Sequence, residues 1–180
     1  MVRRVAITGA GSVNALARDV PGTFAALTAG RVAIGPMLFE DVERLTVQIG
    51  AQVSGWNPEA HFARQEIALY DRAVQFACEA ARQAVAQSGL ALTADEALRA
   101  GVVMGTGGGG FTTIDDSYRA LYAQGKNRVH PFTIPRLMPS AAAAHLAMRH
   151  GVKGPSFTVS TACASSNHAM GLAFQMVRSG

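Results

Sequence analysis

Short apolar runs alternate with longer stretches in which apolar positions recur at helical spacing. The short runs predict strands at residues 5–8, 46–53, 101–105 and 157–160. The longer stretches predict helices at residues 20–28, 65–87, 113–122 and 137–150, and from Cys163 to about residue 178. Strands that alternate with helices are typical of a mostly parallel mixed sheet covered by helices, so we expect one α/β domain.

Two local signals mark helix ends. Gly89 follows the long helix at the position where a C-cap glycine is favoured. Thr93 and Glu96 have the spacing of a capping box, which predicts a further short helix.

The chemical signal of the chain is concentrated at Cys163. It lies where the predicted strand 157–160 becomes the last helix, and its neighbours are small. A thiol at a helix start faces unpaired N–H groups and the positive end of the helix dipole, which favour the thiolate. The same N–H groups could hold a developing oxyanion. Cys163 is therefore predicted to be a nucleophile in acyl transfer.

The other cysteine has a different context. Cys78 lies inside an alanine-rich helical run, and a free cysteine in such a run is typical of core packing. Only Cys163 is predicted to react.

The segment Thr161-Ala-Cys-Ala-Ser-Ser resembles the nucleophile motif of the β-ketoacyl-acyl-carrier-protein synthases, the condensing enzymes of fatty acid synthesis, and the likeness is to the synthase II type. Further segments are similar to that family in the same order along the chain: 4–11, 105–110, 130–135, 144–146 and 151–156. The resemblance thus extends from near residue 3 to residue 180.

The resemblance implies a thiolase-like fold, in which two similar halves, each a sheet covered by helices, stack as five layers. Residues 1–180 correspond to the N-terminal half, the N-terminal β-ketoacyl synthase domain. In the family, two catalytic histidines and a lysine lie in the second half. None of the five histidines here occupies those positions, and His168, five residues past Cys163, should be turned away from it on a helix. We therefore expect the 180-residue chain alone to have an incomplete active site and not to condense.

The implied activity of the complete enzyme is a Claisen condensation in fatty acid biosynthesis. An acyl thioester reacts with malonyl-acyl-carrier protein through an acyl-Cys163 intermediate, and the backbone N–H of Cys163 helps to stabilise the oxyanion. Two alternatives remain open. The chain could be a non-catalytic half-subunit or fragment that acts only by packing with a partner chain, or it could be a thiolase-type acyltransferase.

The resemblance also suggests residues for substrate and partners. Ala162, Gly108 and Thr133 are expected to bind the substrate, and the small Gly108 should leave room for a long acyl chain. A competing hypothesis makes Gly108 only a turn glycine with positive φ. Contacts to an acidic acyl carrier protein are expected from the basic residues Lys126, Arg128 and Arg64, with Arg72 as a further candidate. A homodimer is expected, with residues 157–160 in the interface.

Composition limits the other function classes. The chain has 180 residues, of which 49% are hydrophobic and 16% charged, as in a well-buried globular protein. The 16 basic and 12 acidic residues give a net charge of +4, but no dense basic stripe interleaved with aromatics predicts nucleic-acid binding. No apolar run has the length of a membrane span, no signal peptide is recognisable, and a reactive thiol suits a reducing compartment, so we expect a cytoplasmic protein.

No cofactor or metal is expected. The glycine-rich turn at 8–14 imitates a dinucleotide fingerprint, but Asn14 stands where the third glycine is needed and no acidic ribose partner follows. The spacings of histidine and cysteine give no metal site.

Overall fold

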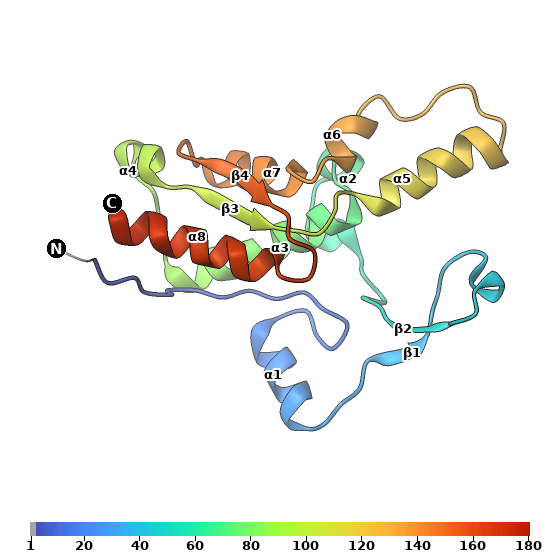
Figure 1. Ribbon diagram of the computed structural model, residues 1–180, viewed down its shortest axis with the longest axis horizontal. Coiled ribbons are helices and arrows are strands. Elements are labelled where there is room, and N and C mark those ends of the chain that lie inside the picture. The colour runs from blue at the N-terminus through green and yellow to red at the C-terminus, as the bar shows by residue number, and fades with distance from the viewer. Residues whose placement is uncertain (1–2) are drawn as a thin grey trace.

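The computed structural model describes residues 3–180 (Figure 1). The first described residues run as an extended segment that pairs with no strand, so the predicted strand at 5–8 is wrong. The side chain of Ile7 is 90% exposed. The backbone N–H of Ala10 donates instead to the side chain of Gln87, at 2.7 Å. An extended apolar run becomes a strand only where a neighbouring strand completes its hydrogen bonds.

Residues 20–51 form a small region beside the main α/β body (Figure 1). A nine-residue helix begins after the N-cap Asp19, whose side chain accepts from Gly22 N. Two short strands then pair antiparallel, with Gly35 opposite Gly50. In chain order the elements up to residue 60 are α1 (Val20–Thr28), β1 (Ile34–Pro36), η1 (Val42–Arg44), β2 (Ile49–Ala51) and η2 (Pro58–Ala60). The predicted helix at 20–28 is confirmed, and the predicted strand at 46–53 is shorter.

The rest of the chain alternates helices with two strands. In chain order these elements are α2 (Arg64–Leu69), α3 (Arg72–Ser88), α4 (Ala94–Arg99), β3 (Val102–Gly105), α5 (Phe111–Tyr118), the π-helical turn η3 (Arg119–Ala123), α6 (Thr133–Leu137), α7 (Ala141–His150), β4 (Ser156–Val159) and α8 (Ser165–Ser179). The last predicted helix therefore begins two residues after Cys163, and the helix predicted at 137–150 begins at Ala141.

The helix predicted at 65–87 is two helices. Tyr70 and Asp71 both have extended backbone angles and separate α2 from α3. The carboxylate of Asp71 caps α3 by accepting from Ala73 N at 2.9 Å. At the other end Gly89 has φ of 66°, as the C-cap prediction requires. The capping box at the start of α4 is also confirmed.

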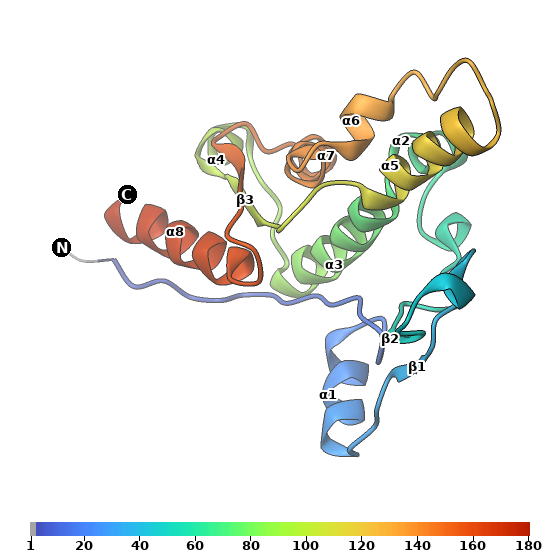
Figure 2. The same ribbon diagram turned by 45° about the vertical axis from the view of Figure 1, so that its right-hand side comes forward.

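Strands β3 and β4 form the parallel sheet of the domain. Val102 lies opposite Ser156, and Gly105 opposite Val159. Helix α8 contacts both strands from one side, while α7 contacts them from the other and packs on α3 (Figure 2). The α/β class is confirmed, although the parallel sheet formed within residues 3–180 has two strands.

The core lies between α3 and α7. Cys78 is fully buried there, which confirms its predicted packing role. Three alanines at the start of α7 are also buried and let the two helices approach closely. The cluster comprises Phe62, Tyr70, Val74, Cys78, Ala141, Ala142 and Leu146.

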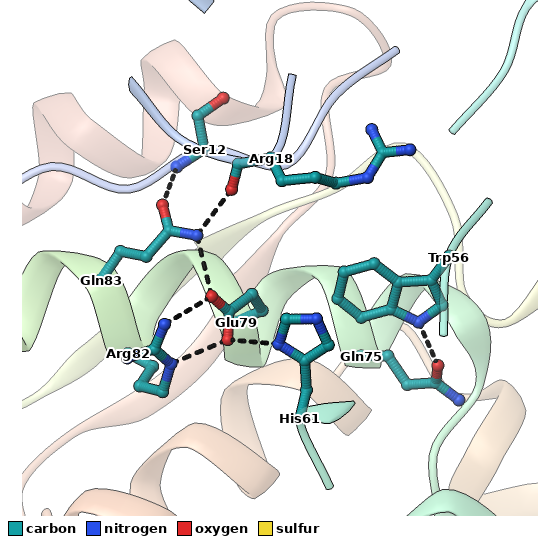
Figure 3. A network of polar contacts seen from close by, with 8 residues as sticks. All are labelled: Ser12, Arg18, Trp56, His61, Gln75, Glu79, Arg82 and Gln83. Carbon is teal, nitrogen blue, oxygen red and sulfur yellow. Dashed lines mark hydrogen bonds and ion pairs between the residues drawn. The ribbon is translucent and has the colours of Figure 1, made fainter. Parts of the chain in front are cut away.

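A second, polar centre on α3 holds distant segments together (Figure 3). Glu79, only 3% exposed, is bound by Arg82 at 2.7 and 2.8 Å and by His61 at 3.2 Å. Gln83 donates to Glu79 at 2.9 Å and to the carbonyl oxygen of Arg18 at 2.7 Å. These contacts fasten the N-terminal segment and the loop around His61 to one face of α3.

No helix among the described residues is long and apolar enough to cross a membrane.

Candidate active site

The turn between β4 and α8 presents Cys163. Ala162, the residue before it, has φ of 50°, a left-handed conformation that costs a residue with a Cβ about 1–2 kcal/mol. The buried hydroxyl of Ser165 holds the turn: it donates to Ala162 O at 2.7 Å and accepts from Thr161 N at 2.9 Å. A strained turn pinned by a buried serine fixes the direction of the residue that follows Ala162.

Cys163 itself is exposed and lies one residue before Ala164, the N-cap of α8. Its backbone N–H takes part in none of the hydrogen bonds between backbone groups within residues 3–180. The side chain therefore has access to a ligand, and a backbone donor stands beside it. This is the pairing of groups that acyl transfer needs.

The glycine segment after β3 lies against this turn. Thr106 N donates to Val159 O at 3.1 Å, which continues the sheet past Gly105. A Cβ on Gly105 would lie 2.6 Å from Cα of Ser166, so α8 packs directly on the end of β3. A Cβ on Gly107 would lie 3.6 Å from Cα of Ala162. The fold thus brings the glycine-rich motif and the cysteine turn together.

Gly108 does not have a positive φ, so the hypothesis of a left-handed turn glycine is wrong. The ring of Phe111 lies against it instead, and a Cβ on Gly108 would be 2.5 Å from Cζ of that ring. The hydroxyl of Thr106 bonds to the backbone of Gly108, with Oγ1 2.6 Å from the carbonyl oxygen. The absence of a side chain at 108 therefore makes space for an aromatic ring three residues later.

Asp71 anchors the far end of the glycine segment. Its carboxylate is 2% exposed and accepts from Thr113 N at 2.8 Å and from Thr113 Oγ1 at 2.7 Å. The same carboxylate caps α3, so a single buried anion joins the starts of α3 and α5. A Cβ on Gly110 would meet this carboxylate at 2.7 Å.

Thr133 begins α6, where its hydroxyl donates to His130 O at 2.6 Å. The helix reaches the glycine segment through Gly110 N, which donates to Leu137 O at 3.0 Å. No hydrogen bond among the described residues joins Thr133 to Cys163. Its predicted substrate role stays a prediction.

The predicted carrier-protein residues lie in two places. Arg64 is exposed at the start of α2. Lys126 and Arg128 lie in the loop between η3 and α6 and line a pocket there. Arg72 is engaged elsewhere, because its guanidinium donates to Val53 O and lies over the ring of Phe76.

No histidine side chain hydrogen-bonds to the Cys163 sulfur in the described part of the chain. His168 is exposed on α8. His145 packs on the ring of Tyr70, and burial lowers the pKa of this histidine. Burial and the nearby Arg149 lower the pKa of His150. No cluster of three or more histidine, cysteine, aspartate or glutamate side chains within 3–180 could hold a metal ion.

Several residues that shape the site were not predicted. The left-handed turn at Ala162 has no local signal, because alanine does not favour it. Asp71 does carry a signal, since aspartate is a preferred N-cap and could have been taken as a helix start. Ser165 is one of the small neighbours of Cys163, and its size alone does not indicate that its hydroxyl holds the turn.

Comparison with known proteins identifies the class of this arrangement. The sequence profile described as "Beta-ketoacyl synthase, N-terminal domain" matches residues 2–180. The chain belongs to the β-ketoacyl synthase family, and the part described here is its N-terminal domain, with the thiolase fold of that family.

Individual relatives agree. The chain is 41% identical to a nodulation protein E of a Rhizobium species. The match covers all of this chain and 44% of the length of that protein. It is 36% identical to 3-oxoacyl-[acyl-carrier-protein] synthase 2 of Coxiella burnetii, covering 97% of this chain and 42% of the relative. The chain therefore spans less than half the length of these curated relatives.

Solved structures show the same fold. A β-ketoacyl synthase from Burkholderia phymatum matches the whole chain and 44% of its own, with a TM-score of 0.78 at 28% identity. The ishigamide ketosynthase/chain length factor matches the whole chain and 45% of its own, with a TM-score of 0.87 at 27% identity.

Proposed function

We propose that this domain carries the nucleophile of a condensing acyltransferase, and that the nucleophile is Cys163. The observation that carries the proposal is the exposed thiol on a strained turn, with a free backbone N–H beside it and a glycine segment packed against it. Ala162 and Gly108 would form the near wall of the acyl site, and Thr133 a more distant part.

The first step is transfer of an acyl group to sulfur. The Cys163 thiolate attacks the carbonyl carbon of an acyl thioester, and the oxyanion is held by the N–H of Cys163. The new carbon–sulfur bond forms, the bond to the carrier sulfur breaks, and the carrier leaves as a thiol with the proton that Cys163 gave up.

The second step forms the carbon–carbon bond. Malonyl-carrier protein loses carbon dioxide, and its electron pair remains on the adjacent carbon as an enolate. That carbon attacks the acyl-Cys163 carbonyl and expels the thiolate, which yields a 3-oxoacyl thioester. We propose that the residues that assist decarboxylation lie outside residues 1–180. They would belong to the part of the complete enzyme that corresponds to the unmatched length of its relatives.

The partner we propose is an acyl carrier protein with an acidic surface. A carrier protein is named in the matching synthase 2 of Coxiella burnetii, and a ketosynthase bound to its carrier protein shares this fold with a TM-score of 0.82 at 21% identity. Lys126, Arg128 and Arg64 are the basic residues that would contact it.

The test is acylation of the full-length protein by an acyl-carrier protein, followed by peptide mapping. Label should appear on Cys163, and Cys163→Ala should abolish condensation. Cys78→Ala is the matched control, because burial raises the pKa of the Cys78 thiol to about 11 and the residue is fully buried. Label on Cys78, or equal rates of alkylation at the two thiols at neutral pH, would overturn the assignment.

The likeness to nodulation protein E favours a second candidate pathway. The identity to that protein, 41%, exceeds the 36% to the synthase 2 of Coxiella burnetii. The same condensation could therefore belong to a pathway that makes one specialised acyl product, and not to general fatty acid biosynthesis. Rescue of a conditional synthase 2 mutant by the full-length gene supports the general pathway, and failure with an active purified enzyme supports the dedicated one.

We also propose that the protein is a homodimer whose interface includes strand β4. Phe157 on that strand is 36% exposed although it lies in the sheet, so its ring is available to another surface. Sedimentation of the full-length protein at micromolar concentration should give a dimer, and a monomer there would count against the interface.

A further inference from the structure

Two donors of Ser165 converge on one carbonyl oxygen of the cysteine turn. Ser165 is the first residue of α8 and is only 3% exposed. Its hydroxyl donates to Ala162 O at 2.7 Å and accepts from Thr161 N at 2.9 Å. Its backbone N–H also donates to Ala162 O, at 3.2 Å. The oxygen that Ser165 holds in this way belongs to the residue directly before Cys163.

This carbonyl lies in the same peptide group as the backbone N–H of Cys163. A trans peptide group is planar, so its C=O and N–H point in opposite directions, and none of the described peptide bonds is cis. Because Ser165 holds the Ala162 oxygen toward α8, the N–H of Cys163 points out from the start of that helix. No backbone acceptor within residues 3–180 bonds to this N–H, so a bound group can use it.

The peptide group on the other side of Ala162 is fixed as well, since Ala164 N donates to Thr161 O at 3.1 Å. The two peptide groups that flank Ala162 set its backbone angles, and they give it the left-handed φ of 50°. An alanine without these restraints would favour a negative φ, because the left-handed region is unfavourable for a residue with a Cβ. The hydrogen bonds from Ser165 oppose that relaxation.

Ser165 itself has little room to shift, because its backbone packs on the end of β3. A Cβ on Gly105 would overlap the backbone of Ser165 and lie 2.6 Å from Cα of Ser166. The sheet therefore fixes Ser165, and Ser165 fixes the peptide group that carries the Cys163 N–H.

We propose that Ser165 is a positioning residue for acyl transfer. Its hydroxyl orients the Ala162–Cys163 peptide group, so that the N–H of Cys163 is aimed at the carbonyl oxygen of the acyl thioester. Ser165 acts through Cys163 and touches no substrate, so this inference rests on the proposed function. Without the hydroxyl, Ala162 O keeps only the longer bond from Ser165 N, and Thr161 N loses its acceptor. The oxyanion donor would then no longer be held in place before the substrate arrives.

The test compares two reactions of the Cys163 thiol in the full-length protein. Acylation by an acyl-carrier protein develops an oxyanion and needs the oriented N–H. Alkylation by iodoacetamide displaces iodide at a saturated carbon and forms no oxyanion. Ser165→Ala should therefore lower kcat for acylation roughly 10- to 100-fold, the effect of a misplaced oxyanion donor, with little change in KM or in the rate of alkylation. A role in stability alone would slow both reactions together.

Two further variants isolate the hydroxyl. The side chains in Ser165→Thr and Ser165→Val have nearly the same shape, but only threonine keeps the oxygen. Ser165→Thr should retain most of the acylation rate, and Ser165→Val should be as slow as Ser165→Ala. Ser179→Ala is the matched control, because the hydroxyl of Ser179 donates to Gln175 O at 2.7 Å at the other end of α8. Its loss should leave both reactions unchanged.

The outcomes separate this inference from the proposed function. If the unchanged protein gains no acyl group on Cys163, the proposed function fails, and the role of Ser165 fails with it. If Cys163 is acylated in the unchanged protein and equally fast in Ser165→Ala, the role of Ser165 alone is refuted. Equal losses in Ser165→Thr and Ser165→Val, or parallel losses of acylation and alkylation, refute it as well.

Discussion

The ring of Phe111 occupies the space that a side chain at Gly108 would need, with Cζ 2.5 Å from the position of the missing Cβ. The ring is also 70% exposed, so it has room to turn toward solvent. The pair therefore acts as one unit: the size of the side chain at 108 decides where the aromatic ring lies.

Gly108→Ile should reduce condensation of long acyl primers more than that of short ones, because the added bulk narrows the site beyond the first few carbons. The measurement is a kinetic series over primer length with a melting curve on the same protein. Gly108→Ile combined with Phe111→Ala should recover part of the loss. A uniform loss over all primers, with a lower melting temperature, would remove Gly108 from the acyl site.

Substitutions at Ala162 should sort by their tolerance of a left-handed backbone. Ala162→Gly should be neutral or stabilising by up to about 1 kcal/mol, since it relieves strain but adds freedom to the unfolded chain. Ala162→Val should destabilise by about 2 kcal/mol, because β-branched residues are genuine outliers at positive φ. Urea unfolding measures both. Equal stability of the two variants would show that this turn is not strained.

Loss of the Asp71 carboxylate should cost about 3 kcal/mol, since three donors from two helix starts lose a buried acceptor. Thr113→Val should cost about 1–2 kcal/mol, and Thr113→Ser, which keeps the hydroxyl, much less. A double-mutant cycle between the two positions measures their coupling. Additive losses would contradict the link between α3 and α5.

The charge network around Glu79 should make stability depend on pH. The hydrogen bond from Arg82, supported by Gln83, lowers the pKa of Glu79 from 4.5 to about 2. A carboxyl whose pKa is lower in the folded state stabilises the protein above the unfolded value and loses this contribution as pH falls. The lowering corresponds to about 3 kcal/mol at most.

Melting curves between pH 5 and pH 2.5 test this. The melting temperature should fall less steeply in Glu79→Gln than in the unchanged protein, because the variant lacks the group that must be protonated. Glu43→Gln, a change at an exposed residue, is the control and should keep the original slope. Parallel curves for all three proteins would show that Glu79 contributes nothing to the acid sensitivity.

Features governed by local sequence were predictable. The helix at 20–28, the C-cap at Gly89, the capping box at Thr93 and the burial of Cys78 follow from short-range patterns, and the structure confirms them. The segments that resemble the synthases were sufficient to place the chain in its family.

Features that depend on contacts between residues far apart in the chain were not predictable from the sequence. Residues 5–8 have the composition of a strand, yet no strand among the described residues pairs with them. The structural role of Glu79 comes from its contacts with His61 and with Gln83, and Gln83 in turn binds the carbonyl oxygen of Arg18. Helical periodicity cannot reveal such contacts. The break before α3 was obscured because apolar spacing continues through it.

The close packing of the glycine segment limits how this region can change in evolution. Any side chain at Gly105 would meet the first turn of α8, and one at Gly109 would meet Leu137 O. Gly107 differs, since a Cβ there would make only ordinary contacts of 3.6 Å with Ala162. A library of variants at these three glycines should therefore recover substitutions almost only at 107. Of these three positions, 107 is therefore the one at which a substitution can change the surface beside the Cys163 thiol without displacing α8.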